Sequence, residues 1–460
     1  MLTVEKIGGS SMSHFDDVVK NIIVGKIKNK KYYDRIFVVS AYNNVTNWLL
    51  EHKKSGTPGI YAKFEGGQNY NQSLDDLLEK LKEINSQLAP IGLNTAVADA
   101  FISERIKQAK SYLQSLAAVM ATGYVNKTNI LLAAREILSS IGEAHSAFNS
   151  VDIIRNSGIN ALFVDLCGFN DPEYYTIDER IQQAFKGIDF TSVLPIATGY
   201  TKGTEGIMRE FDRGYSEVTF SKIAVAVQAD EAVIHKEYHL SSADPNIVGT
   251  DRCIPVIHTN YNVADQLADV GMEAIHPKAS KPLEVAGINI RVKNTFEPEH
   301  PGTLISKDFV SENGKVQIIT GTDKVIAIEV YDPLMVGQSG FDLGIMEIFQ
   351  KYKVSYILKS TSANSITQVI WEKDLNNDLL NELKTKYYNI TIEDCALVCS
   401  LGTNIRKPGV IAKATNALAE KNINIKAMSQ SLSQINIQFV IERERYKEAI
   451  ISLNEALCYK

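Results

Sequence analysis

Two hydrophobic periods alternate along the first 300 residues of the chain. Short runs of β-branched and aromatic residues, typical of strands buried on both faces of a parallel sheet, occupy residues 35–41, 161–165, 192–197, 232–234 and 289–292. A shorter apolar run covers residues 4–7. Between these runs, apolar residues recur at the helical period, most clearly at 72–88, 97–121 and 127–157. The alternation predicts a three-layer α/β domain with a mainly parallel sheet over residues 1–305.

The first strand ends in a turn of glycine and serine, Gly8 to Ser11. A helix is predicted to begin near Ser13, because Asp16 follows at the spacing of a capping box. The apolar residues Phe15, Val18 and Ile22 continue that helix at the expected period.

The last third of the chain contains an internal repeat of 69 residues. Gly340 and Gly409 each open an amphipathic helix, and Ser360 and Ser429 each follow the next predicted strand. Each copy has the order of a ferredoxin-like β-α-β-β-α unit. We therefore predict two small domains, at 320–390 and 391–460. Because such small units usually need a partner to cover one sheet face, they also predict a homodimer or a higher homo-oligomer.

Composition narrows the class of protein. The chain has 48 lysines and arginines against 54 acidic residues, and its net charge of −6 argues against a general nucleic-acid partner. No apolar run approaches the ~18 residues that span a bilayer, and the first residues lack the pattern of a signal peptide. The five scattered cysteines predict reduced, buried thiols. We expect a protein without membrane contact, located in the cytoplasm.

The turn after the first strand is the first candidate for chemistry. Gly8, Gly9 and Ser10 can bring backbone N–H groups to phosphate oxygens, and Lys6 just before them can neutralise a transferring phosphoryl group. The order of a Walker A loop is absent. On this turn alone, an ordinary β-to-α connection is the more frequent explanation.

Polar residues near two other segments form the second candidate. Ser40 ends a buried strand and Thr46 follows it, where open α/β sheets bind ligands, although turn and helix-cap roles explain them equally well. Arg213, in Asp212-Arg-Gly-Tyr-Ser-Glu217, is suited to a carboxylate, and Glu217 to positioning a lysine, but a solvated loop explains this segment as well. Glu143, within a helical segment, could reach a substrate ammonium.

The histidines of His235-Lys-Glu-Tyr-His239 do not have the order of a zinc-binding helix. Because they follow an apolar run and precede two serines, the segment is predicted to be a strand and loop. We predict no metal site in the protein.

Together these motifs resemble those of aspartokinases, in family order along nearly the whole chain. The matching segments are Lys6–Ser11, Ser40-Ala41 with Val45–Asn47, Gly142-Glu143 with Ser146, Arg213–Glu217, Ala243–Pro245, Ile275–Pro277, Val292–Phe296 and Pro301–Thr303. The C-terminal repeat resembles the two ACT domains of that family, with Ile435–Ile437 matching the second.

The resemblance implies an amino-acid-kinase fold, followed by two ferredoxin-like ACT domains. It implies transfer of the γ-phosphoryl group of ATP to the β-carboxylate of L-aspartate, with Mg²⁺ carried by the nucleotide. Lys6 and Glu217 would then be catalytic. Substrate would be held by Ser40, Thr46, Glu143, Arg213, Gly214 and Ser216, and nucleotide by Lys6, Gly8, Gly9, Ser10, His235 and Lys236.

Several positions depart from the usual family pattern. His235-Lys236 replaces a Thr-Asp pair, Glu273 replaces a lysine, and Tyr215 and Glu217 replace glycine and aspartate. This pattern is similar to that of the specialised aspartokinases associated with ectoine biosynthesis. Because nucleotide contacts have changed, a catalytically silent, ACT-based amino-acid sensor is an alternative. Another carboxylate or carbamate kinase of the same fold is a third.

Overall fold

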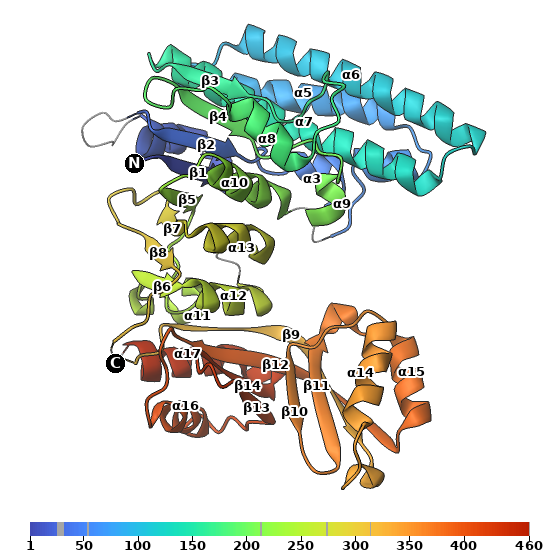
Figure 1. The fold of residues 1–460 in the computed structure, drawn as a ribbon, viewed down its shortest axis with the longest axis vertical. Helices are drawn as coiled ribbons and strands as arrows, with labels where there is room; N and C mark the ends of the chain where they lie inside the picture. The colour runs from blue at the N-terminus through green and yellow to red at the C-terminus, as the bar shows by residue number, and fades with distance from the viewer. Residues whose placement is uncertain (25–31, 53–54, 212–213, 273–274, 313, 460) are drawn as a thin grey trace. The chain divides into compact units, whose positions relative to one another are not determined.

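Six parallel strands of an eight-stranded sheet form the centre of the N-terminal region in the computed structural model, which describes residues 1–24, 32–52, 55–211, 214–272, 275–312 and 314–459 (Figure 1). The strand order is β3-β4-β2-β1-β5-β7. Its strands are β1 (Thr3–Ile7), β2 (Arg35–Val39), β3 (Ala161–Val164), β4 (Leu194–Thr198), β5 (Glu231–Lys236) and β7 (Asn289–Asn294). The predicted strands are confirmed, with ends that differ by no more than two residues.

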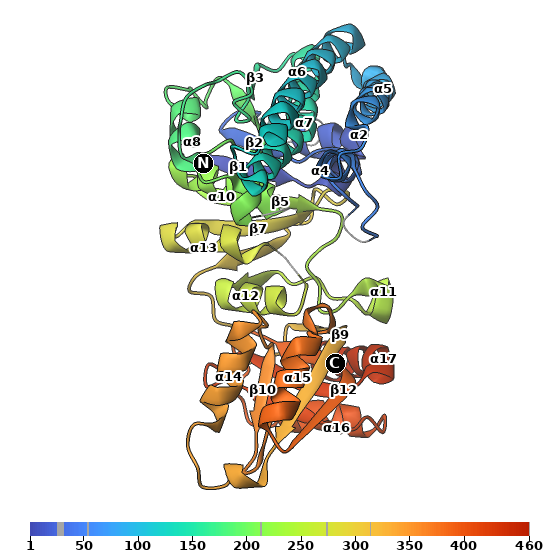
Figure 2. The same cartoon turned by 90° about the vertical axis from the view of Figure 1, so that its right-hand side faces the viewer.

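The helices of this region confirm the long predicted segments. Asn69, Asn94 and Asn126 each accept a backbone N–H with the side chain, which explains where α5, α6 and α7 begin. Both views show these three helices running side by side (Figure 1 and Figure 2). The longer helices are α5 (Tyr70–Leu88), α6 (Thr95–Thr122), α7 (Lys127–Asn156), α8 (Ile177–Phe185), α10 (Tyr215–Ala226) and α13 (Pro277–Ala286). Shorter ones are α3 (Val45–Leu49), α4 (Ile60–Glu65), η3 (Ala89–Ile91) and α9 (Ile207–Phe211).

The helix predicted to begin near Ser13 is present from Phe15, but it lacks the predicted capping box and a separate short helix precedes it. Helix α1 (Gly9–Met12) begins directly after β1, because the N–H of Met12 bonds to the carbonyl of Gly8 at 2.9 Å. Helix α2 (Phe15–Val18) then begins after His14 with no side-chain cap, and η1 (Val19–Ile23) continues it. Asp16 lies in the first turn of α2, where it meets the helix dipole but completes no capping box.

The parallel register decides which side chains share a face of the sheet. Lys6 aligns with Val38 and Ile234, and we call their side the Lys6 face. Glu5 aligns with Phe37 and Val233 on the opposite side, the Glu5 face. Helix α10 covers the Lys6 face and α7 covers the β2–β4 part of the Glu5 face. The three predicted layers are therefore helices, sheet and helices.

The C-terminal repeat forms one antiparallel sheet in the order β10-β11-β9-β12-β14-β13. Gly340 and Gly409, the N-caps of equivalent helices, have nearly equal left-handed φ angles of 96° and 92°, which confirms the repeat at backbone level. The first copy contains β9 (Ile318–Tyr331), α14 (Phe341–Lys351), β10 (Leu358–Thr361), β11 (Ser365–Trp371) and α15 (Asn377–Lys386). The second contains β12 (Asn389–Leu401), α16 (Val410–Ala419), β13 (Ala427–Gln430), β14 (Asn436–Glu442), α17 (Tyr446–Asn454) and η9 (Glu455–Tyr459). Single-turn helices are η6 (Pro333–Met335), η7 (Glu372–Asp374) and η8 (Arg443–Arg445).

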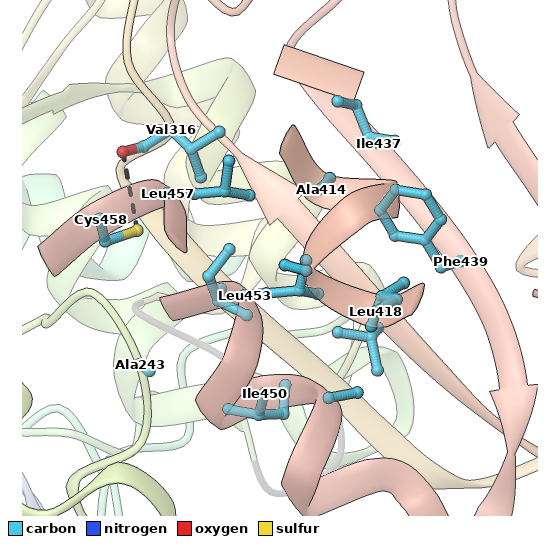
Figure 3. Close-up of a cluster of buried hydrophobic side chains, with 14 of the residues drawn as sticks. Ala243, Val316, Ala414, Leu418, Ile437, Phe439, Ile450, Leu453, Leu457 and Cys458 are labelled. Atoms are coloured by element: carbon cyan, nitrogen blue, oxygen red, sulfur yellow. Dashed lines mark hydrogen bonds between the residues drawn. The ribbon is translucent and has the colours of Figure 1, made fainter. Parts of the chain in front are cut away.

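Each copy has its own hydrophobic core. Ile326, Ile345 and Ile370 lie in the core of the first copy. Figure 3 shows the core of the second, in which Leu418, Phe439 and others pack around the C-terminal helices. The start of β9 belongs to this second core through Ile319, and the preceding Val316 accepts a weak bond from the Cys458 thiol at 3.7 Å. The two ACT-like cores therefore share one long strand.

The chain divides into two compact units, Met1–His239 with Ile275–Leu304 and Leu240–Ala274 with Ile305–Lys460. This division differs from the predicted bounds, because residues 240–274 pack with the C-terminal unit. Ala243 and Val248 lie in its core, and the Ser242 hydroxyl donates to Asn454 at 2.9 Å. The segment contains α11 (Pro245–Val248), η5 (Thr250–Arg252), β6 (His258–Asn260) and α12 (Tyr261–Asp269), and β8 (Thr303–Ser306) spans the point where the chain passes into the second unit. The domain bounds stay a prediction.

Two further expectations concern the cysteines and membrane-spanning helices. All five cysteines are free, and four of them are buried as predicted, while Cys253 is partly exposed. Among the described residues, no helix is long and apolar enough to cross a membrane.

Candidate active site

Lys6 and Glu217 meet at the carboxyl end of β1. Lys6 Nζ lies 3.4 Å from Glu217 Oε1, and the two side chains are only 8% and 16% exposed. Burial alone would raise the pKa of Glu217, but the charges of Lys6 and Lys236 and a backbone bond from His276 hold it below its usual value. The lowered pKa favours the carboxylate form of Glu217. Because the contact between Lys6 and Glu217 is long and both side chains are partly accessible, Lys6 can also bind a ligand.

Glu143, on α7, lies at the same sheet edge but in a drier environment. Burial raises its pKa well above the usual carboxyl value, against the charge of Lys6 and hydrogen bonds from Ala41 and Tyr215. Its Oε2 is buried and has no hydrogen-bond partner in the described part of the chain. An unsatisfied buried carboxyl oxygen favours a cationic or N–H-bearing ligand at this point.

The loop after β2 and the first turn of α10 approach each other at this edge. The Ser40 and Ser216 hydroxyls are 3.3 Å apart, and Ser146 on α7 donates to the Ser40 carbonyl at 2.9 Å. Gly199, after β4, fits between these elements, because a Cβ there would stand 2.7 Å from Ser216 Cβ and 3.0 Å from Glu143 Oε2. Glycine is therefore required for the close approach of the groups.

The glycine turn after β1 also needs an unobstructed backbone. A Cβ on Gly9 would lie 3.1 Å from the carbonyl oxygen of Ala41, so the two loops are in close contact. Gly8 caps α1 in an extended conformation, and Ser10 is exposed in the first turn. Ser11 is buried, and its hydroxyl donates to Glu237 Oε1 at 2.8 Å, which anchors the turn to the chain after β5.

His276 positions the opposite side of the site. Its backbone N–H donates to Glu217 Oε2 at 2.6 Å, and its Nδ1 caps α13 by accepting from Lys278 N at 3.2 Å. Its ring lies so near Gly214 that a Cβ there would stand 3.0 Å from Cδ2. In the sequence, His276-Pro277 matches a family motif but has no predicted role. A histidine directly before a proline at the start of a helix could have indicated the cap, but not the contact with Glu217.

The remaining predicted residues differ in position. Lys236 is close enough to lower the pKa of Glu217, whereas His235 points to the Glu5 face, where its Nε2 lies 2.7 Å from Glu5 Oε2. Thr46 lies half-buried in the first turn of α3. Arg213 lies outside the described residues. The structure brings Lys6, Glu217, Glu143, Ser40, Ser216 and Gly214 to one sheet edge, while the predicted contact of His235 with nucleotide stays a prediction.

Comparison with known proteins identifies the class of this fold and site. The model of the amino acid kinase family matches residues 1–294, and an ACT domain model matches residues 398–457. Aspartate kinase Ask_Ect of Stutzerimonas stutzeri is 44% identical over 463 residues, which cover 99% of this chain and 97% of that protein.

Two solved structures share the fold over 99% of this chain and 100% of theirs. The Clostridium acetobutylicum aspartate kinase superposes with a TM-score of 0.75 at 23% identity. The Escherichia coli aspartokinase III complex with aspartate and ADP superposes with a TM-score of 0.70 at 19% identity. The chain belongs to the amino acid kinase family and, within it, to the aspartokinases.

Proposed function

We propose that the chain is an aspartate kinase that transfers the γ-phosphoryl group of ATP to the β-carboxylate of L-aspartate. The single observation that carries the proposal is the buried Lys6–Glu217 pair beside the glycine turn. A lysine held there by one long ion pair is placed to stabilise charge that develops on a transferring phosphoryl group. Membership of the aspartokinases and the 44% identical relative support the choice of aspartate as acceptor.

In the proposed reaction, a carboxylate oxygen of aspartate forms a bond to the γ-phosphorus while the bond to the β,γ-bridging oxygen breaks. The products are 4-phospho-L-aspartate and ADP. The nucleophile is already ionised at neutral pH, so the protein needs no general base. The work of the site is positioning and charge stabilisation. Mg²⁺ would enter with the nucleotide phosphates and neutralise part of their charge.

The named residues divide between nucleotide and acceptor. Lys6 and the N–H groups of Gly8, Gly9 and Ser10 would contact the phosphoryl group, and Lys236, on the Lys6 face, would add charge near the phosphates. Glu217 would orient Lys6. Arg213, Gly214, Ser216, Ser40 and Thr46 would hold the acceptor. Glu143 would receive its ammonium group, which fits the unsatisfied Oε2.

We further propose that the enzyme is of the subtype associated with ectoine biosynthesis and works as a homodimer or higher homo-oligomer through its ACT domains. The replacement of the usual Thr-Asp pair by His235-Lys236 and the similarity to Ask_Ect support the subtype. The product would be the first intermediate of aspartate-family amino-acid or ectoine biosynthesis.

Trapping of the acyl phosphate by hydroxylamine tests the reaction. The purified protein is incubated with ATP, Mg²⁺ and hydroxylamine, and hydroxamate is measured with aspartate, with glutamate and without acceptor. We expect hydroxamate from aspartate only, lost in Lys6→Ala and kept in Lys281→Ala, which removes an exposed lysine of α13. Product from glutamate alone would identify another carboxylate kinase. No product with any acceptor, combined with amino-acid binding, would identify a sensor.

A further inference from the structure

A polar cavity lies on the Glu5 face, on the opposite side of the sheet from Lys6. Its volume is about 440 Å³, and its floor is formed by strands β2, β1, β5 and β7. The wall residues come from η1 and from the segment that follows β7. The acidic and basic residues that line it are Glu5, Arg35, Glu231, Arg291 and Lys293, together with His235. A cluster of this kind is unusual on a parallel sheet, whose faces are normally covered by apolar side chains.

Both acids of the cavity are fully engaged by arginines. Arg35 Nε and Nη2 donate to the two oxygens of Glu5 at 2.6 and 3.0 Å. Arg291 Nε and Nη2 donate to the two oxygens of Glu231, both at 2.8 Å. Each pair has the bidentate geometry of a strong ion pair, so the two acids and the two arginines neutralise each other.

Lys293 is the additional cation. Its Nζ donates to the carbonyl oxygen of Pro298 at 3.0 Å, and no carboxylate lies within 4 Å of it among the described residues. Burial lowers its pKa, and the charges of Arg291 and Arg35 act in the same direction against that of Glu5. Arg35 adds a buried Nη1 that has no acceptor in the described part of the chain. The cavity therefore carries one more positive charge than its acids balance.

We propose that this cavity binds a small tetrahedral oxyanion, of which inorganic phosphate and sulfate are the simplest, with Lys293 as its main charged contact. An anion would balance the excess cation and accept the hydrogen bonds that Lys293 has left to donate. The site does not depend on the proposed kinase reaction, because the Lys6 side chain points to the opposite face of the sheet. For a single small ion, an affinity in about the millimolar range is expected.

Thermal unfolding of the full chain tests the site. Wild-type protein is titrated with inorganic phosphate and, separately, with sulfate, while chloride keeps the ionic strength constant. We expect both oxyanions to raise Tm, since a ligand that binds only the folded state stabilises it. The rise should persist in Lys6→Ala, disappear in Lys293→Met and persist in Lys281→Met. The expected loss of affinity in Lys293→Met is about tenfold or more.

The controls separate the cavity from other causes. Without phosphate, Lys293→Met should be at least as stable as wild type, because methionine keeps the aliphatic length and removes an unbalanced charge. If that variant does not fold, Lys293→Gln replaces it, and line broadening of the phosphorus resonance of phosphate on wild-type and Lys6→Ala protein measures binding directly. A rise that is lost in Lys6→Ala but kept in Lys293→Met, an equal rise with chloride, or no broadening would overturn the proposal.

Discussion

Two adjacent residues of β1, Glu5 and Lys6, send opposite charges to opposite faces of one sheet. Glu5 lies within 3.0 Å of three nitrogen donors from Arg35 and His235. Lys6 has one acceptor among the described residues, Glu217, at 3.4 Å. Both side chains are buried, but only the charge of Glu5 is balanced by several short contacts within the protein. Burial alone therefore does not distinguish the two residues. The incomplete pairing of Lys6 is what indicates that it lies in the active site.

The largest expected effect tests the under-paired side of this comparison. Lys6→Ala should lower kcat by about 10²–10³-fold, because the lost ammonium stabilises charge in the transition state. Tm should change little, since one long contact is removed. Steady-state kinetics with a parallel melting curve measure both. A variant that keeps more than about a tenth of wild-type kcat, a loss under ~1.4 kcal/mol, would show that Lys6 is assigned wrongly.

Glu143→Gln should raise the KM for aspartate by about 100-fold, since a neutral amide replaces the partner of the ammonium. The same change should raise Tm without substrate, because it removes a carboxyl that burial disfavours in its charged form. In wild type the raised pKa means that Glu143 must lose a proton to pair with ammonium, so the KM for aspartate should fall as pH rises. A pH-independent KM would place the ammonium elsewhere.

Arg213→Lys should raise the KM for aspartate about tenfold and the KM for ATP much less. An ammonium group cannot reproduce the bidentate contact of a guanidinium with the α-carboxylate. Arg213 lies outside the described residues, so this prediction depends on the sequence motif alone. Separate titrations of the two substrates measure it, and equal effects would move Arg213 to the nucleotide side.

Substitution of Glu5, the fully paired residue, should change the stability of the protein rather than its catalytic rate. Glu5→Gln should lower the free energy of unfolding by about 3 kcal/mol, because it leaves Arg35 buried without its carboxylate. Since the pKa of Glu5 is far below its usual value, its contribution is complete above pH 4.5 and is lost as pH falls toward the folded pKa. Between pH 7 and pH 3, the free energy of unfolding measured with urea should therefore fall more steeply in wild type than in Glu5→Gln.

The surface pair Glu79–Lys82, in which Glu79 is 73% exposed, is the matched control for Glu5. Glu79→Gln should cost less than about 1 kcal/mol. If Glu5→Gln changes kcat strongly with unchanged stability, the division between the two faces of β1 is wrong.

The smallest expected effect concerns regulation. Lysine should inhibit weakly or not at all, because Ile357 and Ala363, on either side of β10, offer no acidic group to a ligand ammonium. Lys359, on β10, adds a positive charge and forms an ion pair with Asp342 at 2.7 Å. Activity is measured across a lysine titration to ~10 mM, and half-inhibition below ~1 mM would contradict the expectation.

The sequence predicted the candidate site in part. The motif order indicated that Lys6, Glu217 and Glu143 act together, and they do meet at one sheet edge. It did not indicate that His276 holds Glu217 through its backbone N–H, because a main-chain contact leaves no residue-type pattern. It also grouped His235 with Lys236, whereas consecutive residues of a strand point to opposite faces.

The sequence by itself determined the α/β alternation, the 69-residue repeat and the family of the chain. These properties depend on local periodicity and on the order of motifs, and both can be recognised in the sequence itself. Only the tertiary structure decided which charges are paired, where the unsatisfied oxygen of Glu143 lies and that residues 240–274 pack with the C-terminal unit. The reason is physical: pairing and burial depend on distances between residues that lie far apart in the sequence, such as Lys6 and Glu217, which are 211 positions apart. Such distances are fixed by strand register and packing rather than by any local pattern.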